Sequence, residues 1–430
     1  RRQFLKRTAG LTAAAAGFPM VIPSSALGLA GATAPSNRIV MGCIGVGSQG
    51  TGNLDGFLKF PEVQVVGIAD VDANHRARAK KMIDGTYDNQ DCAEYNDYRD
   101  LLARGDLDAL SLALPDHWHS IPAIEAARLK LDMYAEKPLA LTVSEGRAMV
   151  TAVKANKVVW QTGSWQRSRP QFRKACEVVR NGRIGEVHTV KVGLPTGSGC
   201  DTVEEMPVPN GFDYNRWLGP APEAPYTELR CHWNFRWILD YSGGQLTDWG
   251  AHHCDIANWG MGTERTGPIE IEGTGVFPRS GLWNAATDYY VICRFAPGAS
   301  PVAPKGFNMI LSNAFPNGTR FEGTKGWVFV DRGGWKTEPE NLRGTVIGDD
   351  EIRLYESDNH AGNFLECVRS RKETVTPIEA AHYAINNAHL GNIAMRLGRK
   401  VRWDAVKERF VNDPIADRML SRAMRAPWTI

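Results

Sequence analysis

Residues 45–50 read Gly45-Val46-Gly47-Ser48-Gln49-Gly50, a GxGxxG hexapeptide between an apolar run and a helical pattern. Each glycine has a physical reason. The first permits a tight turn, the second lets the backbone approach a pyrophosphate, and the third lets helix and strand pack closely. The N-terminus of the following helix would face the negative charge. Alone, the hexapeptide could be a glycine-rich turn without a ligand. The segments around it decide whether it binds a dinucleotide.

Two predicted strands give that context, one over residues 38–44 before the turn and a second over residues 63–69. The second strand ends at Asp70, twenty residues beyond Gly50, where a carboxylate can accept the hydroxyls of a dinucleotide ribose. Asp72 follows, and two carboxylates would repel a 2′-phosphate. We therefore expect a dinucleotide-binding domain that takes NAD rather than NADP.

The rest of the chain shows two different patterns of apolar runs and intervening segments. Up to about residue 160, β-branched runs alternate with helical patterns, which predicts a parallel sheet covered by helices on both faces. From about residue 186, glycine- and proline-rich turns separate the apolar runs, which predicts a mostly antiparallel sheet. Residues 362–397 are helical again. The expected strands are residues 38–44, 63–69, 109–114, 132–135, 158–162, 187–194, 269–277, 288–295, 308–313 and 327–330.

The bulk composition bounds the class of protein. With 43% apolar residues, 23% charged residues and a formal net charge of +2, the chain of 430 residues is neither disordered nor typical of a nucleic-acid-binding protein. No run after the leader reaches the roughly 18 apolar residues that a membrane-spanning helix needs. We expect small-molecule partners and no nucleic acid.

The N-terminal leader, residues 1–34, begins with Arg1 and Arg2, continues with a modestly apolar run and offers small-residue cleavage positions near its end. It resembles a twin-arginine export signal; a retained arm or a basic amphipathic anchor is the alternative. Export in the folded state would carry NAD to a periplasmic or other extracytoplasmic compartment. Since no nicotinamide pool would replenish it there, we expect tightly bound NAD that is recycled in place.

Two motifs follow predicted strands at the edge where an open α/β sheet binds its ligand. The first, LALPDHWH at residues 112–119, contributes Pro115, His117 and His119. The second, YAEKPL at residues 134–139, contributes Glu136 and Lys137. The following proline restrains the backbone, so the ammonium of Lys137 can be aimed at a substrate oxygen. A solvated charge pair at a turn is the alternative for Glu136 and Lys137.

The stretch GGQLTDWGAHHCD at residues 243–255 concentrates ionisable side chains. If Asp248 begins a helix, Asp248, His252 and Asp255 share one face, and the aspartate can orient the imidazole for acid–base work. His253 falls on the neighbouring face and is expected to pack. No HExxH or CxxC pattern completes a ligand set, so we expect no metal.

Aromatic and basic residues form two further candidate segments, WQRSR at residues 165–169 and HWNFRW at residues 232–237. Rings can stack on the C–H faces of a sugar, and guanidinium groups can hold its hydroxyls or a carboxylate. Ordinary core or subunit packing is the alternative. The expected substrate-binding residues are Trp165, Arg167, Trp233, Arg236, Asp248 and His252.

Together, GVGSQG, Asp70, PDHWH, EKP and the 243–255 stretch resemble the Gfo/Idh/MocA family, named for glucose-fructose oxidoreductase, inositol dehydrogenase and rhizopine catabolism, over about residues 38–403. The resemblance implies catalytic Lys137, Asp248 and His252. It departs at Gln245, where the family has a third glycine. The expected cofactor-binding residues are Gly45, Gly47, Ser48, Gln49, Gly50, Asp70, Pro115, His117, His119, Glu136, Lys137 and Gln166.

The resemblance also implies the domain plan, which combines an α/β domain with an α+β domain. Residues 37–160 form a Rossmann NAD-binding domain. Residues 161–360 form an open-faced, mostly antiparallel β-sheet domain for substrate binding and oligomerisation. Residues 361–430 form a C-terminal helix and tail that pack back on the domain interface. An open sheet face leads us to expect a homodimer or homotetramer.

The expected activity is NAD-dependent oxidation of a CH–OH group on a sugar, glycoside or cyclitol. His252 takes the hydroxyl proton and Lys137 stabilises the developing charge, although the two could exchange roles. One alternative is a redox-neutral, NAD-dependent glycoside hydrolase. Another is a nucleotide-bound binding protein without catalysis.

Overall fold

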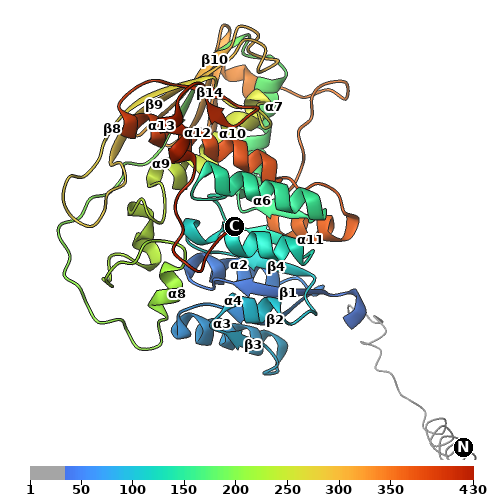
Figure 1. The fold of residues 1–430 in the computed structure, drawn as a ribbon. Helices are drawn as coiled ribbons and strands as arrows, with labels where there is room; N and C mark the ends of the chain where they lie inside the picture. Colours follow the sequence, from blue (N-terminus) through green and yellow to red (C-terminus); the bar gives the residue numbers. More distant parts are fainter. Residues whose placement is uncertain (1–33) are drawn as a thin grey trace, which may run out of the picture.

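The computed structural model describes residues 34–430. The predicted twin-arginine leader therefore lies outside the described residues, except for Ala34. Within them, the α/β domain and the mostly antiparallel β domain that the sequence predicts are both confirmed. They lie at opposite ends of the molecule, with the Rossmann sheet below and the large sheet above (Figure 1).

The first domain holds six parallel strands in the order β3-β2-β1-β4-β5-β6. This is the dinucleotide-binding order, in which the ligand crevice lies beyond the carboxyl ends of the central strands. The short β3 was not predicted, because its three residues carry no apolar run. The strands are β1 Ile39–Ile44, β2 Val63–Ala69, β3 Ala93–Tyr95, β4 Ala109–Leu112, β5 Asp132–Ala135 and β6 Trp160–Thr162.

Side-chain caps start several of the crossover helices. The Asp72 carboxylate accepts from Asn74 N at 2.8 Å, and the Thr142 hydroxyl accepts from Glu145 N at 3.2 Å. Such caps satisfy amide groups that have no partner within the helix. The helices are η2 Pro35–Asn37, α2 Ser48–Leu58, α3 Ala73–Tyr87, α4 Tyr98–Leu102, η3 Asp116–Trp118, α5 Ser120–Arg128 and α6 Val143–Asn156.

The second domain is built on a nine-stranded sheet in the order β13-β12-β11-β7-β10-β9-β8-β14-β15. Its strand pairs are antiparallel except β7 with β10. The strands are β7 Val187–Gly193, β8 Glu270–Val276, β9 Asp288–Phe295, β10 Phe307–Ser312, β11 Gly318–Gly323, β12 Gly326–Asp331, β13 Gly334–Glu338, β14 Val401–Asp404 and β15 Arg409–Phe410.

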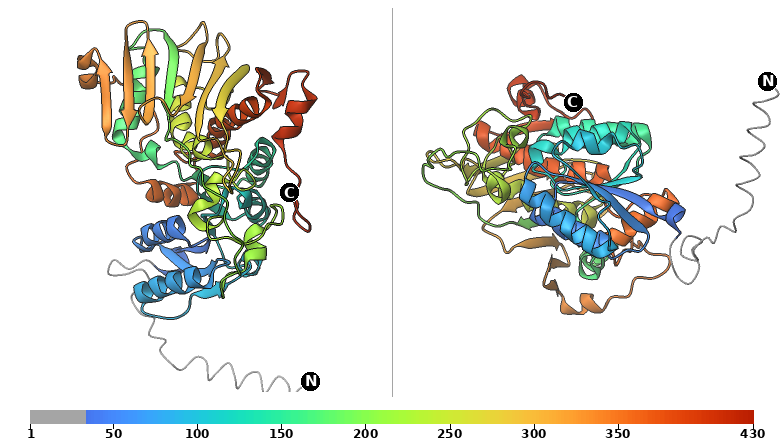
Figure 2. Two further views of the ribbon diagram at one scale, coloured as in Figure 1. Left: turned by 90° about the vertical axis from the view of Figure 1, so that its left-hand side faces the viewer. Right: turned by 90° about the horizontal axis from the view of Figure 1, so that it is seen from below.

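Helices cover one face of this sheet, and the other face is open (Figure 2). The alternating burial of β9 shows this, since Tyr289 and Val291 are buried while Tyr290 is 41% exposed. The helices of the domain are η4 Trp165–Ser168, α7 Pro170–Arg180, α8 Tyr214–Leu218, η5 His232–Trp237, α9 Gln245–Asp248, α10 Gly250–Met261 and η6 Glu340–Gly344.

The C-terminal region joins the two domains. Helix α12, buried along most of its length, packs on α6, α10 and β8, and His389 Nε2 lies 3.0 Å from the carbonyl oxygen of Ala140. The predicted single helical stretch of residues 362–397 is two helices. The tail then adds β14 and β15 to the sheet, which the sequence did not predict. The remaining helices are α11 His360–Ser370, α12 Ile378–Leu397, α13 Pro414–Asp417 and η7 Arg418–Leu420.

Beyond η7, the tail returns to the Rossmann domain. Arg422 donates from Nε and Nη2 to Glu145 Oε1 at 3.1 and 2.8 Å, and the Trp428 ring lies edge-on to Trp118 at 4.7 Å between centroids. Glu145 is only 2% exposed, so its carboxylate depends on these partners. Among residues 34–430, none of the helices combines the length and apolarity that crossing a bilayer requires.

The Arg422→Ala variant should release this tail. Because it removes a principal charge partner of the buried Glu145 carboxylate, we expect a loss of about 3 kcal/mol in the free energy of unfolding. Limited proteolysis should then cut within residues 421–430. The matched control is Arg418→Ala, at an exposed position nearby. Equal stability and equal cleavage in the two variants would contradict the docking of the tail.

Candidate functional site

A cavity of about 640 Å³ lies between the two domains, at the carboxyl edge of the Rossmann sheet. The carboxyl end of β2, the glycine-rich turn and Lys137 line it on the Rossmann side, and α9 and η5 line it on the side of the β-sheet domain. The predicted cofactor residues that line it are Gly45, Gly47, Ser48, Gln49, Gly50, Asp70, Pro115, Glu136 and Lys137. The predicted substrate residues that line it are Trp233, Arg236 and Asp248.

The glycine-rich turn has the close contacts that its sequence predicts. A Cβ at Gly45, whose φ is +80°, would lie 2.3 Å from Ala113 O, and one at Gly50 would lie 2.0 Å from Gly45 O. Gly47 is the N-cap of α2 and provides no side-chain cap for that helix. The first amide groups of α2 therefore remain available beside the cavity, which is the arrangement that binds a pyrophosphate. A dinucleotide fits this cradle.

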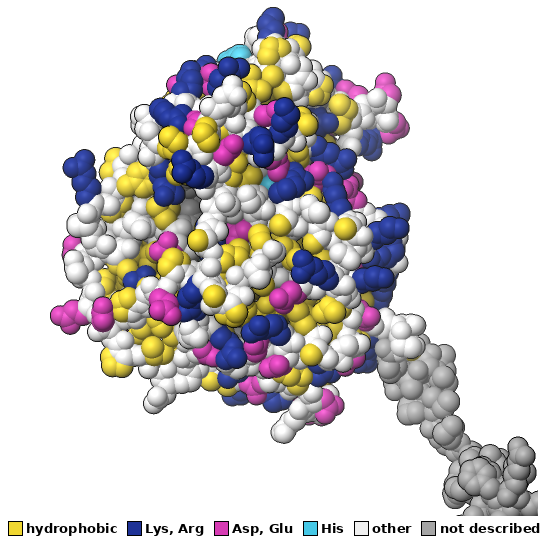
Figure 3. Space-filling model, viewed as in Figure 1, with side chains coloured by type: hydrophobic (Ala, Val, Ile, Leu, Met, Phe, Trp, Pro, Cys, Tyr) yellow, Lys and Arg dark blue, Asp and Glu magenta, His cyan; other side chains and the backbone are white. Residues whose placement is uncertain are grey.

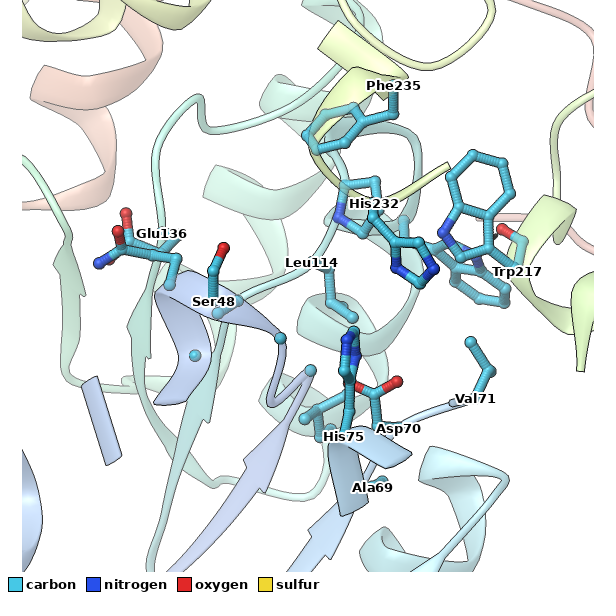
Figure 4. A pocket seen from close by; sticks show the side chains of 18 of the residues that line it. Ser48, Ala69, Asp70, Val71, His75, Leu114, Glu136, Trp217, His232 and Phe235 are labelled. Carbon is cyan, nitrogen blue, oxygen red and sulfur yellow. Dashed lines mark hydrogen bonds and ion pairs between the residues drawn. The ribbon is translucent and has the colours of Figure 1, made fainter. Parts of the chain in front are cut away.

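Asp70 fixes the turn as well as lining the cavity. Its Oδ2 accepts from Val46 N at 2.8 Å, and its Oδ1 accepts from Asp72 N at 2.9 Å. His75 Nδ1 lies 3.4 Å from Asp70 Oδ2, and this hydrogen bond is the main reason why the pKa of His75 is raised. Figure 4 shows His75 and Asp70 on one side of the cavity and His232 opposite them. The carboxylate stands at the ribose end of the predicted site.

A strap formed by residues 209–217 crosses that end of the cavity. Phe212 forms a β-bridge with Asp72, Asp213 N donates to Val71 O at 2.9 Å, and Asn96 Nδ2 donates to Asp213 Oδ2 at 2.8 Å. Phe212 and Trp217 line the cavity, together with Trp428 from the tail. These residues were not among the predicted site residues, because no spacing or motif in the sequence places them beside the end of β2.

The other end of the cavity is organised by Lys137. Its Nζ donates to Asp248 Oδ1 at 2.6 Å and to the Asp248 carbonyl oxygen at 3.3 Å. Arg236 Nε lies 3.4 Å from the same Oδ1. Burial alone would raise the pKa of Asp248, but the charges of Lys137 and Arg236 outweigh burial and lower it. Asp248 is therefore an ionised group that holds two cations at the domain junction.

The predicted pairing of Asp248 with His252 is replaced by this arrangement. The helix breaks at Trp249: α9 ends at Asp248, α10 begins at Gly250, and His252 N bonds to the carbonyl oxygen of Trp249. The Asp248 carbonyl is thereby left free for Lys137. No side-chain hydrogen bond between Asp248 and His252 is present among the described residues, so Asp248 positions Lys137 and does not orient the imidazole.

His252 is buried among aromatic groups and is not one of the residues that line the cavity. Its ring is 6.4 Å from that of Trp165 and 6.0 Å from that of Trp249, and its Nδ1 is buried without a protein partner. Burial, followed by the charges of Lys137 and Arg332, holds its pKa well below the ordinary value. A neutral imidazole at this position can accept a proton. His253 is buried and pairs with Asn317, as expected of a packing residue.

Glu136 joins the glycine-rich helix to the end of β5. Its Oε1 accepts from Asn53 Nδ2 at 3.0 Å and from Gln49 Nε2 at 3.2 Å, and burial raises its pKa. The Glu136-Lys137 dipeptide is therefore not a solvated turn pair. Glu136 faces α2, whereas Lys137 faces α9. The end of β5 therefore directs one charged side chain to the glycine-rich helix and the other to the β-sheet domain.

Three predicted cofactor residues lie behind the cavity wall and do not line it. The Nε2 atom of His117 lies 3.0 Å from Trp217 O, and the Nε2 atom of His119 lies 2.7 Å from Leu114 O; both rings are buried. Gln166 is 1% exposed, and its amide atoms have no protein partner. These side chains support the wall, and LALPDHWH contributes mainly Leu114, Pro115 and Asp116 to the cavity.

Arg167 was predicted to bind substrate, but it is a buried structural residue. Its Nε and Nη2 bond both carboxylate oxygens of Asp255 at 2.7 and 2.6 Å, and Nη1 bonds Glu264 at 2.8 Å. At 3% exposure it cannot reach a ligand. Trp165, also predicted there, contacts His252 rather than the cavity lining.

Two family models cover nearly all of the described chain. An oxidoreductase-family NAD-binding Rossmann fold matches residues 39–164, and the C-terminal α/β domain of the same family matches residues 170–430. The chain belongs to the Gfo/Idh/MocA oxidoreductase family.

Curated relatives within this family differ in activity. The Bacillus subtilis oxidoreductase YrbE is 29% identical over 54% of this chain and 56% of its own length. A Thermotoga maritima myo-inositol 2-dehydrogenase is 23% identical over 68% of this chain and 75% of its own length. A Shewanella oneidensis α-N-acetylgalactosaminidase is 29% identical over 44% of each chain. The chain thus spans about half of the length of several relatives.

Solved structures support the fold. The Chromobacterium violaceum WlbA dehydrogenase, solved with NADH and UDP-GlcNAcA, has a TM-score of 0.62 at 16% identity, covering 90% of this chain and 99% of that one. The Caulobacter crescentus aldose-aldose oxidoreductase has a TM-score of 0.59 at 19% identity, covering 85% and 99%. At these identities the likeness concerns the fold.

The glycine-rich turn gives a matched pair of substitutions on one helix. Gly50→Ala should weaken NAD binding at least tenfold, because the new Cβ would lie 2.0 Å from Gly45 O and displace the cradle. Gly52→Ala has open space around its Cβ and should bind NAD normally, with stability raised by about 0.5–1 kcal/mol. Calorimetric titration with NAD checks both variants. Equal affinity in the two would contradict pyrophosphate binding here.

The Arg167→Met variant separates a structural role from a substrate-binding role. Because it leaves Asp255 buried without its partner, the free energy of unfolding should fall by about 3–5 kcal/mol. Urea denaturation measures this loss. The exposed Arg265→Met, which removes a surface pair with Glu373 at 3.5 Å, should change stability by less than about 1 kcal/mol. An unchanged free energy of unfolding in Arg167→Met would contradict the structural role and favour the predicted substrate-binding role of Arg167.

Proposed function

We propose that this chain oxidises a CH–OH group of a sugar, glycoside or cyclitol with NAD. The observation that carries the proposal is the position of the paired Lys137 and Asp248 in the same cavity as the glycine-rich cradle. The myo-inositol dehydrogenase relative and the ligands of the WlbA structure support a carbohydrate-type substrate. NAD is preferred to NADP, because Asp70 and Asp72 stand at the ribose end.

Bound NAD⁺ supplies the acceptor for the hydride that leaves the substrate carbon. Lys137, held by Asp248, donates a hydrogen bond to the substrate oxygen and stabilises its developing negative charge. His252 takes the hydroxyl proton at Nδ1, which is buried without a protein partner. Asp248 acts through Lys137. Lys137 and His252 could exchange proton duties within one network.

The proposal includes tight retention of NAD. Phe212 and Trp217 of the strap of residues 209–217 line the cavity together with Trp428, and their contacts would slow the release of a dinucleotide. Retention suits export of the folded protein to the periplasm by the twin-arginine route, for which the leader sequence is the support. The open face of the β sheet, with Tyr290 and Val276 exposed, supports a homodimer or homotetramer.

A second candidate is a redox-neutral glycoside hydrolase, in which NAD oxidises the sugar, the glycosidic bond is eliminated, and the product is re-reduced. Its support is the α-N-acetylgalactosaminidase relative and a Shewanella baltica relative named glycosyl hydrolase family 109 protein, 31% identical over 44% of each chain. Both candidates use the same Lys137, His252 and NAD, and they differ in whether NADH accumulates.

Incubation with a panel of sugars and glycosides tests the proposal, with nicotinamide fluorescence and product analysis as readouts. We expect NADH to form with at least one sugar, or a glycoside to be cleaved without net NADH for the second candidate. Lys137→Ala should lower the rate by about 10²–10⁴-fold while NAD remains bound.

The matched control is Lys154→Ala, which removes an exposed lysine that pairs with Glu379. It should leave the rate unchanged. Neither NADH formation nor glycoside cleavage across the panel would favour a non-catalytic binding protein and contradict the proposal.

A further inference from the structure

Arg332 is an exposed cationic side chain near the candidate site. Arg332 lies at the turn between β12 and β13, and its guanidinium carbon is 4.7 Å from the centroid of the Trp165 ring and 4.4 Å from that of Trp249. Within residues 34–430, no carboxylate forms an ion pair with it. Two aromatic rings thus hold a cation in place while its N–H groups remain available.

The same two rings connect Arg332 to the proposed reaction centre. Trp165 and Trp249 both lie edge-on to His252, at 6.4 and 6.0 Å between centroids. The charge of Arg332 is also felt there, since it contributes to the low pKa of His252. Arg332 and His252 therefore lie against the same two tryptophan rings.

The balance of charge around this point is positive. Asp248 is the one acid whose charge acts appreciably on Arg332, and it is already bound by Lys137 and Arg236. A further arginine, Arg169, lies 5.2 Å from the Trp165 ring. Lys137 and Arg236 thus share the Asp248 carboxylate, whereas neither Arg332 nor Arg169 forms an ion pair within residues 34–430.

The excess of positive charge around Arg332 is local. On the face shown in Figure 3, basic and acidic side chains are interspersed, and the formal net charge of the whole chain is +2. Long-range steering of anions by the protein as a whole is therefore weak, and any selection for a charged substrate must come from close contact.

We propose that Arg332 is a specificity-determining residue that binds an anionic group of the sugar substrate. A guanidinium offers parallel N–H donors that match a carboxylate, as in a uronic acid, or a sugar phosphate or sulfate ester. Trp165 and Trp249 hold the guanidinium in place, so little side-chain entropy remains to be lost on binding. This inference rests on the proposed function for its choice of a sugar ligand, although binding can be measured without turnover.

Tryptophan fluorescence provides that measurement, because Trp165 and Trp249 flank Arg332. The NAD-loaded protein is titrated with paired sugars that differ in charge, namely glucuronate against glucose and galacturonate against galactose. At least one uronate should bind about tenfold or more tightly than its neutral partner, the size of one charge-assisted contact. Glucose 6-phosphate and glucose 6-sulfate then distinguish an ester from a carboxylate as the anion.

Arg332→Gln should remove this selectivity and leave the affinity for neutral sugars unchanged, and Arg332→Lys should keep part of it. The matched control is Arg320→Gln, which removes an arginine that lies over the Trp327 ring at 4.0 Å and is paired with Glu322. Equal binding of charged and neutral sugars, binding of none of them, or selectivity that survives Arg332→Gln would overturn the inference. Charge-selective binding without NADH formation or glycoside cleavage would contradict the proposed function alone.

Discussion

The ion pair between Lys137 and Asp248, 2.6 Å between Nζ and Oδ1, is the contact on which the rest of the site depends. It joins the carboxyl end of a Rossmann strand to the end of a helix in the β-sheet domain. Both side chains are largely buried, so the pair is stable only while the two domains remain docked. The docking of the domains and the placement of the proposed catalytic lysine are therefore one structural event.

The cofactor side of this site was predictable, because its physics is local. A pyrophosphate requires closely approaching backbone, and the turn leaves no room for a Cβ at Gly45 or Gly50. Asp70 was found for a similar reason, since the length of one β-α-β unit determines where the next strand ends. Strand alternation and turn composition were likewise enough to predict both sheets, except for the short β3, for β11 and β13, which begin with glycine, and for β14 and β15 in the tail.

The substrate side was predicted less completely, because contacts between residues that are distant in the sequence determine where its side chains point. Helical periodicity placed Asp248 and His252 on one face, but the break at Trp249 turned the Asp248 carboxylate and carbonyl toward Lys137. Arg167 has the composition of a sugar-binding residue, yet two acids from α10 and the following loop hold it in the core. Arg332 and the strap of residues 209–217 come from distant segments that carry no motif.

The central claim is that a dinucleotide spans the cavity from the glycine-rich turn to Lys137. The most direct test is a crystal structure of the protein as purified, with its bound nucleotide. We expect the pyrophosphate at the N-terminus of α2, the ribose at Asp70 and the nicotinamide ring facing Lys137. A nucleotide bound elsewhere, or a nicotinamide turned away from Lys137 and His252, would contradict the account.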